Sequence, residues 1–434
     1  MMPSRGSPPI RPAIEAAFEY LFPLYEMART RYLLIESPAN PRRLPPGAIN
    51  HRRLLADHRS RAVTTPNNDT LYSSSWLDLA ASPVIVSIPR VVERYWSVAL
   101  MDMATNNFAM LGSRLDGEGP LQVLVASPHW QGNAPAGLRI VRAPGNDVWL
   151  LARWLVDGPH DTAAVHEIQD AMRIDALVPG GPRVGQSVAP TASTDAQNFL
   201  AVANEMLARN PVPAAERSMV AAWSSLGVRP GTADTWHALD EATRSAWQAG
   251  IEALHEPLRA GLWADARRVG GWAYPPAQIG QFGTHYRLRA AVALGGLGAL
   301  EPAEAIYLGL DQGPDGLPLD GSRRYRLSVP AGGLATDAFW SLSMYDLLPD
   351  GRSFFVANPI ARYAVGDRTS GLVRQPDGSF DLWIQHEQPA ADDPHAANWL
   401  PAPAGRFQLT LRAYLPRPAL LAGEAPLPML ELID

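Results

Sequence analysis

Two regions of the chain alternate apolar and polar residues with the period of a β-strand, and prolines and glycines separate the alternating segments. The first region, about residues 60–157, predicts strands at 83–89, 95–102, 121–127, 138–143 and 148–156. The second region, about residues 303–416, predicts strands at 305–311, 325–330, 339–346, 380–386 and 407–416. Many short strands joined by turns are typical of β-sandwiches.

The two regions resemble each other. YWSVALMD at 95–102 returns as FWSLSMYD at 339–346, with Trp, Ser and Asp in register. IVSIP before the first copy is echoed by RLSVP before the second, and LLARWLV resembles LTLRAYL, which pairs Arg153 with Arg412. We interpret this as two sandwich domains of similar topology, the alternative being a chance similarity between buried strands.

Helical spacing dominates the stretch between the β regions. STDAQNFLAVANEMLARN predicts a capped helix, and ATRSAWQAGIEALHEPLRAGLW continues in the same style. The apolar positions of the first helix are Phe199, Leu200, Ala203, Met206 and Leu207. Near the amino terminus, IEAAFEYLFPLYEMARTRYLL predicts a helix that Pro23 interrupts. We therefore expect an N-terminal helical segment at 1–39, a first sandwich at 40–158, a helical connection at 159–275 and a second sandwich with a leading helix at 276–434.

Composition removes several kinds of chemistry. The chain has no cysteine and no lysine, so all 37 basic residues are arginine. Thiol nucleophiles, disulfides, Schiff bases and phosphate-loop lysines are excluded, and we expect no cofactor. A net charge of −6 with scattered arginine pairs argues against nucleic acid. No apolar run reaches the roughly 18–20 residues of a membrane span. No apolar core of a secretory signal is visible, which predicts a cytoplasmic protein.

The densest polar segment of the first region is TTPNNDTLYSSSWLDL, residues 64–79. Short amides and carboxylates after a proline favour an Asx turn, which is the structural interpretation. The run also offers a compact array of hydrogen-bond donors and acceptors that a turn alone does not require. We take Asp69 and Tyr72 as candidate catalytic residues, and Asn67 and Asn68 as candidate substrate-binding residues.

A carboxylate ends each copy of the repeated strand. Alternation places Trp96 and Asp102 on one face of the first copy, and Trp340 and Asp346 on one face of the second. A carboxylate that closes an apolar row either anchors the following loop or faces a cavity at the rim of the sandwich. Both alternatives stay open, and Asp102 and Trp340 join the substrate-binding candidates.

A third candidate lies in QFGTHYRLRAAVALGGLG, residues 281–298. Thr284 is a plausible N-cap, and Gly295 with Gly296 would end the helix. His285 and Arg289 would then lie one turn apart, with Tyr286 beside Arg289. The helix dipole would favour a neutral His285, and the three side chains could bind a carboxylate or an oxyanion and exchange a proton. The alternative is a helix face paired with another part of the protein.

Other common sites are absent from the sequence. There is no H-E-x-x-H motif, and the histidines match no rigid ligand spacing, so we predict no metal site. G-x-S-x-G is missing, and no glycine fingerprint follows a predicted strand. These absences argue against a serine hydrolase of the common type and against a dinucleotide enzyme.

At PNNDTLYSSSWLDL and RYWSVALMDMATNNF the sequence resembles a bacterial family known as a domain of unknown function, number twelve fifty-four. From GQFGTHYRLRAAVALGGLGALEPAEAIY through AFWSLSMYD, NPIARYAVGD and NWLPAPAGRFQLTLRAYLP it resembles family number twelve fourteen, which usually follows the first. The resemblance implies two tandem jelly-roll-like β-sandwiches plus helices, in proteins that are often exported, and assigns no catalytic role. His285 stands at a position where the family pattern has Asp. Arg362 lies in one of the strongest motifs of the family, and we add it to the substrate-binding candidates.

We therefore expect a metal-independent acid–base enzyme, a lyase, hydrolase or isomerase, whose small organic substrate bears a carbonyl or carboxylate. Asp69 or His285 would accept the proton. Tyr72 or Tyr286 would donate it, and Arg289 would bind the anionic group. The alternatives are a non-catalytic binding protein for a carbohydrate or a lipophilic ligand, and a structural component. The expected partner is a small molecule, and homo-oligomerisation is left open.

Overall fold

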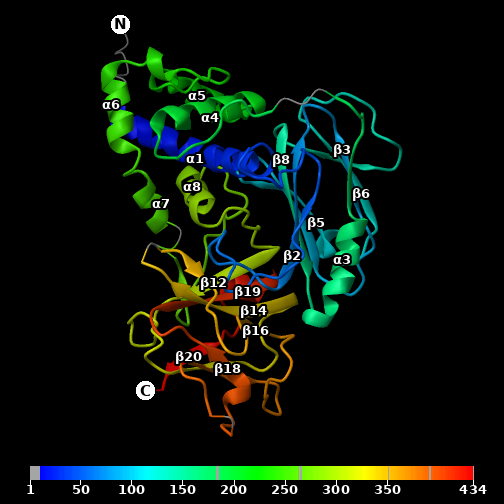
Figure 1. The fold of residues 1–434 in the computed structure, drawn as a ribbon, viewed down its shortest axis with the longest axis vertical. Coiled ribbons are helices and arrows are strands. Elements are labelled where there is room, and N and C mark those ends of the chain that lie inside the picture. Colours follow the sequence, from blue (N-terminus) through cyan, green and yellow to red (C-terminus); the bar gives the residue numbers. More distant parts are fainter. Residues whose placement is uncertain are drawn as a thin grey trace.

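The computed structural model describes residues 10–433 apart from 182–184, 262, 264, 265, 350 and 391, so residues 1–9 of the expected N-terminal segment lie outside it. Four β-sheets fall into two regions of the chain, with a helical segment between these regions in the sequence (Figure 1). The predicted division into two β regions joined by helices is thereby confirmed, whereas the jelly-roll character stays a prediction. Among the described helices, none is long and apolar enough to cross a membrane.

The first β region contains two sheets. The five-stranded sheet has the order β1 (Asn50–His51), β2 (Thr70–Asp78), β8 (Asp147–Leu155), β4 (Trp96–Met101) and β5 (Asn107–Gly112). The four-stranded sheet has the order β7 (Arg139–Arg142), β6 (Leu121–Ala126), β3 (Val84–Ile88) and β9 (Arg173–Ala176). Alternate side chains of β4 and β8, among them Trp96 and Trp154, point into a core shared by both sheets. Helices α2 (Ser113–Asp116) and α3 (Thr162–Ala171) follow β5 and β8.

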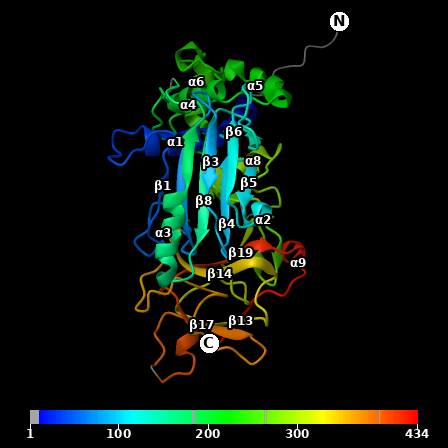
Figure 2. The same cartoon turned by 90° about the vertical axis from the view of Figure 1, so that its right-hand side faces the viewer.

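The second β region is also built from two sheets (Figure 2). The larger sheet has the order β10 (Arg268–Val269), β11 (Trp272–Ala273), β12 (Ala305–Leu310), β19 (Phe407–Pro416), β14 (Thr336–Leu347) and β15 (Ser353–Phe354), and β16 (Ala364–Gly366) also pairs with β14. The smaller sheet has the order β18 (Trp399–Pro401), β17 (Phe380–Gln385), β13 (Tyr325–Val329) and β20 (Met429–Leu432). Trp340 and Leu342 of β14 lie in the core between these sheets. Helix α9 (Pro418–Ala422) connects β19 and β20.

Strand order and direction correspond between the two regions. The central strands β2, β8 and β4 occupy the places of β12, β19 and β14. In the smaller sheets, β7, β6, β3 and β9 correspond to β18, β17, β13 and β20, and the first pair of each series is parallel while the other pairs are antiparallel. The repeat inferred from FWSLSMYD and YWSVALMD is therefore a repeat of topology.

The strand register makes Arg153 and Arg412 equivalent. Arg153 on β8 lies opposite Tyr72 on β2 and opposite Ser97 on β4. At the same places, Arg412 on β19 lies opposite Tyr307 on β12 and opposite Ser341 on β14. The pairing of these two arginines predicted from the sequence is confirmed.

The helical part covers the face of the first five-stranded sheet that points away from β3 and β6 (Figures 1 and 2). Its helices are α1 (Ile10–Ile35), α4 (Ala196–Arg209), α5 (Arg217–Ala222), α6 (Glu241–Gly250), α7 (His255–Gly261) and α8 (Tyr286–Gly295). Short 3₁₀ turns lie at Pro159–Asp161, Ala214–Glu216, Ser224–Leu226, Trp236–Ala238 and Ala396–Asn398. The predicted cap of α4 is present, because the Asp195 side chain accepts a hydrogen bond from the Asn198 backbone N–H.

Two helix predictions were wrong in detail. Pro23 does not interrupt the N-terminal helix, because α1 continues unbroken from Ile10 to Ile35 with Pro23 inside it. Proline removes one backbone hydrogen bond, but buried neighbours such as Phe22 and Tyr25 hold the helix through packing. At α8 the N-cap is His285 and not Thr284, because the first intrahelical bond runs from the Arg289 N–H to the His285 carbonyl.

Gly366 allows β16 to approach β14 closely, as Gly112 does for β5 and β4. A Cβ atom on Gly366 would lie 2.3 Å from the Trp340 backbone oxygen, and one on Gly112 would lie 2.6 Å from that of Trp96. Gly366→Ala is expected to lower the free energy of unfolding by about 1–3 kcal/mol because the strands must separate. Urea denaturation measures this, with Gly309→Ala on β12 as the control, since its Cβ would meet nothing within 4 Å. Equal losses in both variants would contradict the prediction.

Candidate functional site

Residues 67–72 lead into β2 at the place where the two β regions meet. Asn67 forms the expected Asx turn, since its Oδ1 accepts a hydrogen bond from the Asp69 backbone N–H at 2.6 Å. The same segment also reaches across to the second region. Asn67 Nδ2 donates to Tyr414 Oη at 2.7 Å, and Asp69 Oδ2 accepts from Ser341 Oγ at 2.5 Å. The polar run is therefore both a turn and a contact between the two regions.

Tyr72, Arg153, Tyr307, Arg412 and Tyr414 gather at this contact, and we call them the arginine–tyrosine cluster. Both arginines are buried, with 4% and 3% of their surface exposed. The guanidinium carbon of Arg153 lies 5.4 Å from the ring centre of Tyr72, and that of Arg412 lies 5.4 Å from the ring centre of Tyr307. Each repeat thus contributes one arginine under one tyrosine ring.

The tyrosines differ in exposure. Tyr72 and Tyr307 are half-buried, whereas Tyr414 is buried and stacks on Phe339 with ring centres 4.1 Å apart. Burial raises the pKa of Tyr307 and raises that of Tyr414 further. Both hydroxyls therefore stay protonated at neutral pH and can donate hydrogen bonds.

One buried acid from each repeat borders the cluster. Asp69 precedes Tyr72 by three residues, and Glu304 precedes Tyr307 by three residues, so the two acids occupy equivalent places before equivalent strands. Both are buried, with 8% and 1% of their surface exposed. Asp69 was predicted from the sequence as a site residue, whereas Glu304 was not.

Each acid is held by the opposite region. Arg368 of the second region approaches Asp69, with Nη2 to Oδ1 at 3.8 Å. Arg114 of the first region donates from Nε to Glu304 Oε2 at 2.8 Å, and Tyr95 Oη donates to Oε1 at 2.7 Å. Burial raises the pKa of Glu304, and these two hydrogen bonds oppose that shift. The cluster thus lies inside a network that neither region forms alone.

The predicted His285, Tyr286 and Arg289 group forms a separate polar site on α8. His285 is exposed, while Arg289 is buried with its guanidinium carbon 5.1 Å from the ring centre of Tyr20 and 5.0 Å from that of Tyr286. Tyr286 Oη donates to Glu216 Oε1 at 3.1 Å. The structure brings Tyr286 and Arg289 together, but their contacts are with α1 and the turn at 214–216, whereas those of Asp69 are with β14 and Arg368.

Asp102 binds the backbone of the loop that follows it, and Asp346 binds a backbone N–H of β15 across the loop that follows it. Asp102 Oδ1 accepts hydrogen bonds from the backbone N–H groups of Ala104 and Asn106, each at 2.9 Å. Asp346 Oδ1 accepts one from the Phe354 N–H at 2.9 Å. Of the two alternatives left by the sequence, loop anchoring is the one these contacts display.

The other substrate-binding candidates lie in different surroundings. Trp340 belongs to the apolar core between the sheets of the second region, on the face of β14 opposite Ser341. Arg362 donates to the backbone oxygens of Ala397 and Trp399 at 2.9 and 2.7 Å, which joins the segment before β16 to the start of β18 and the turn before it. Asn68 Oδ1 is buried without a hydrogen-bond partner.

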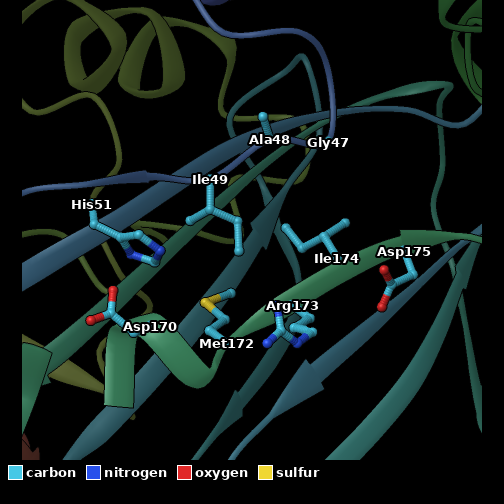
Figure 3. Close-up of a pocket in the computed structure, with 9 residues that line it drawn as sticks. All are labelled: Gly47, Ala48, Ile49, His51, Asp170, Met172, Arg173, Ile174 and Asp175. Carbon is cyan, nitrogen blue, oxygen red and sulfur yellow. The ribbon is translucent and has the colours of Figure 1, made fainter. Parts of the chain in front are cut away.

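A surface hollow of about 340 Å³ lies between β1 and β9 (Figure 3). His51 and Asp170 point into the same side of it, with Arg173 and Asp175 farther along. His51 Nδ1 is engaged with Ser73 Oγ at 2.7 Å, and burial lowers the pKa of His51. A second hollow of about 670 Å³ is lined by 87–89, 120–122, 137–139 and 171. Neither hollow is lined by a predicted site residue, and in the part of the chain that the structure describes no three acidic or histidine side chains are grouped to hold a metal.

Residues 46–176 match the family described as protein of unknown function DUF1254, and residues 304–418 match the one described as DUF1214. The chain carries these two domains in tandem. It is also similar to a crystal structure of a protein from Vibrio parahaemolyticus, with 25% identity, a TM-score of 0.73 and coverage of 98% of this chain and 100% of that one. A protein from Burkholderia cenocepacia has 12% identity, a TM-score of 0.48 and coverage of 99% and 92%. No curated protein matches the chain.

The DUF1254 domain contributes Tyr72 and Arg153 to the cluster, and the DUF1214 domain contributes Tyr307, Arg412 and Tyr414. Of these five, sequence reasoning selected Tyr72 alone as a site residue. A usable signal was present, since the two arginines interrupt apolar strands at equivalent places of the repeat. A charged side chain retained in a buried strand indicates a buried polar contact.

Proposed function

We propose that the protein is an acid–base enzyme that binds a small organic substrate with a carbonyl or carboxylate at the arginine–tyrosine cluster. One observation carries this proposal: Arg153 is buried between the two domains, yet its Nε and Nη1 atoms have no hydrogen-bond partner. A buried charge without partners is costly unless a ligand supplies them. The half-buried Tyr72 and Tyr307 beside the arginines leave surface through which a small molecule can reach the cluster.

The cluster supplies the groups that proton transfer next to a carbonyl requires. Asp69 is the proposed proton acceptor, because its carboxylate faces the domain contact. Tyr307 and Tyr414 remain protonated and would donate hydrogen bonds to an oxygen on which negative charge develops. Arg153 takes the anion-binding role expected of Arg289, whose own contacts are with α1.

Proton exchange tests this proposal across whole classes of candidate substrate at once. The protein is incubated in D₂O with pools of small oxo acids, hydroxy acids and esters, and NMR detects deuterium uptake or new products. We expect one class to react, and Asp69→Asn to slow that reaction by about 10²-fold or more. The matched control is Asp337→Asn, an exposed acid paired with Arg417.

One outcome would contradict the role of Asp69, and another would contradict the enzyme itself. If Asp69→Asn and Asp337→Asn react at the wild-type rate, Asp69 is not the acceptor. If the wild type binds members of the pools and leaves all of them unchanged, the protein is a binding module, the second candidate left by the sequence. The aromatic rings that border the cluster would suit such a ligand site equally well.

A further inference from the structure

The two repeats place an arginine at the same position but surround it differently. Arg412 makes three hydrogen bonds, two with its own domain and one with the loop before Asp69. Its Nη1 donates to Ser343 Oγ at 2.7 Å, and its Nη2 donates to Tyr345 Oη at 2.6 Å and to the Thr65 backbone oxygen at 3.0 Å. Ser343 and Tyr345 lie on β14, two and four residues beyond Ser341. Both terminal nitrogens of Arg412 therefore have hydrogen-bond partners within the protein itself.

Arg153 lacks these partners because the sequence of the first repeat differs at two positions. Two and four residues beyond Ser97, β4 carries Ala99 and Met101, which offer no acceptor comparable to a hydroxyl. Arg153 makes one hydrogen bond, from Nη2 to the Gly298 backbone oxygen at 2.8 Å. Its Nε and Nη1 are buried and unpartnered. The second repeat serves as an internal reference for what a satisfied arginine looks like at this place.

The surroundings of Arg153 do not replace the missing acceptors. The Tyr72 ring attracts the charge through its face, but a ring face is a weak hydrogen-bond acceptor. Glu304 of the second repeat lies close enough to Arg153 for their charges to interact, but its two oxygens are already bound by Tyr95 and Arg114. The Arg153 guanidinium therefore has a positive charge and hydrogen-bond donors available to bind a ligand.

Building on the proposed function, we infer that Arg153 binds the anionic group of the substrate and that this substrate is a monocarboxylate with a compact apolar body. Arg412, by contrast, is a structural arginine. Planar carboxylates suit a guanidinium better than other small anions of the same charge. Aromatic walls suit an apolar body, since Tyr72 lies over Arg153 and Tyr414 stacks on Phe339.

The two buried acids beside the cluster indicate that the substrate carries a single negative charge. Asp69 and Glu304 border the cluster from opposite domains and are both engaged by arginine side chains. A second anionic group on the substrate would lie beside one of these carboxylates or beside Arg412, whose donors are occupied. Repulsion without compensation therefore disfavours dicarboxylates and dianionic phosphates.

Three probes and three variants of the full chain test the inference. Benzoate, the neutral isostere benzamide and the dianion phthalate are titrated by calorimetry. We expect benzoate to bind wild type at least tenfold more tightly than either of the others. Arg153→Met should weaken benzoate at least tenfold. Ala99→Ser should do the same without lowering the thermal midpoint, because its hydroxyl would meet Arg153 as Ser343 meets Arg412 at 2.7 Å. Ser343→Ala, the mirror change in the second repeat, should leave benzoate affinity within twofold.

Each contrary result has a definite meaning. No benzoate binding by wild type at about 10 mM, where even weak sites fill, overturns the inference. So does benzoate binding that Arg153→Met leaves intact, phthalate binding as tight as that of benzoate, or a loss in Ser343→Ala equal to that in Ala99→Ser. Turnover in the D₂O assay that survives Arg153→Met sinks this inference and leaves acid–base catalysis standing, but with another group than Arg153 binding the anion. Arg153-dependent benzoate binding by a protein that turns over no compound upholds the inference and removes the enzyme.

Discussion

Arg412→Met is expected to lower the free energy of unfolding by about 3–5 kcal/mol, whereas the equivalent change Arg153→Met should alter it by less than about 1 kcal/mol. Removing Arg412 leaves Ser343 Oγ and Tyr345 Oη buried with a lost partner, and it removes a positive charge near Asp69. Removing Arg153 gives up one hydrogen bond to a backbone oxygen, but it also eliminates two buried donors that have no partner.

Urea denaturation of the two variants side by side measures this difference. Strand position, side-chain identity and burial are the same, because both arginines lie opposite a tyrosine and a serine and are nearly inaccessible to solvent. The comparison therefore isolates the partners from the cost of replacing a buried arginine. Equal losses in the two variants would show that the hydrogen bonds of Arg412 do not distinguish it from Arg153.

The ten strands predicted from the sequence all correspond to strands of the structure, whereas others, among them β2 and β5, were not in the predicted set. The segment 83–89 exceeds β3 by one residue at each end, and 325–330 exceeds β13 by one residue at its C-terminal end. Each strand buries one face in a single core, so alternation alone marks its limits. β14 was predicted less well, because it begins at Thr336 where the prediction began at 339. The extra residues are exposed or partly exposed and include Thr336 and Asp337, and the pairing of Thr336 with Pro416 of β19 extends the strand beyond its apolar part.

The candidate site could be predicted only where its residues lie close together in the chain. Asp69 and Tyr72 stand out from the polar run that contains them, but the partner of Asp69 on β14, Ser341, is 272 residues away. Tyr307 in AIYLGLD has the pattern of an ordinary strand residue. The repeat showed that Arg153 and Arg412 are equivalent, yet it could not show that the two sheets carrying them face each other. That arrangement depends on how the domains pack.

The facing repeats explain why the cluster needs both domains. Asp69 of the DUF1254 domain is bound from β14, and Glu304 of the DUF1214 domain is bound by Tyr95 at the start of β4. Ser341 and Tyr95 belong to the two copies of the sequence that first revealed the repeat. In each repeated strand the Trp side chain therefore points into the core of its own sandwich. The residue next to it points to the other face and binds the buried acid of the other domain.

Asp147→Asn is expected to destabilise the protein by about 3–5 kcal/mol, because this buried carboxylate joins the first β region to the helices. Asp147 is fully buried on β8, and Arg209 of α4 donates to both of its oxygens at 2.7 Å. Arg31 of α1, also buried, lies 3.3 Å from Oδ1. An amide at this position leaves two guanidinium groups without their shared counter-charge.

The pH dependence of stability provides a second test of the role of Asp147. Burial tends to raise the pKa of Asp147, but Arg209 and Arg31 hold it below its usual value. A folded-state pKa below the unfolded value of about 3.9 means that the stabilisation is complete above that pH and is lost as the pH falls below it. Burial raises the pKa of Asp78 and the charge of Asp147 raises it further, so the opposite-sign contribution of Asp78 to the pH dependence is smaller in Asp147→Asn than in the wild type.

Urea midpoints measured from neutral pH down to about pH 3 should therefore draw closer together for wild type and Asp147→Asn once the pH falls below the unfolded-state pKa, because only the wild type then loses stability by protonation at this position. The control is Asp337→Asn, because the Asp337–Arg417 pair is largely exposed and should contribute less than about 1 kcal/mol at any pH. A gap between wild type and Asp147→Asn that stays constant down to the lowest pH would mean that the charge of Asp147 is not what holds α1, α4 and β8 together.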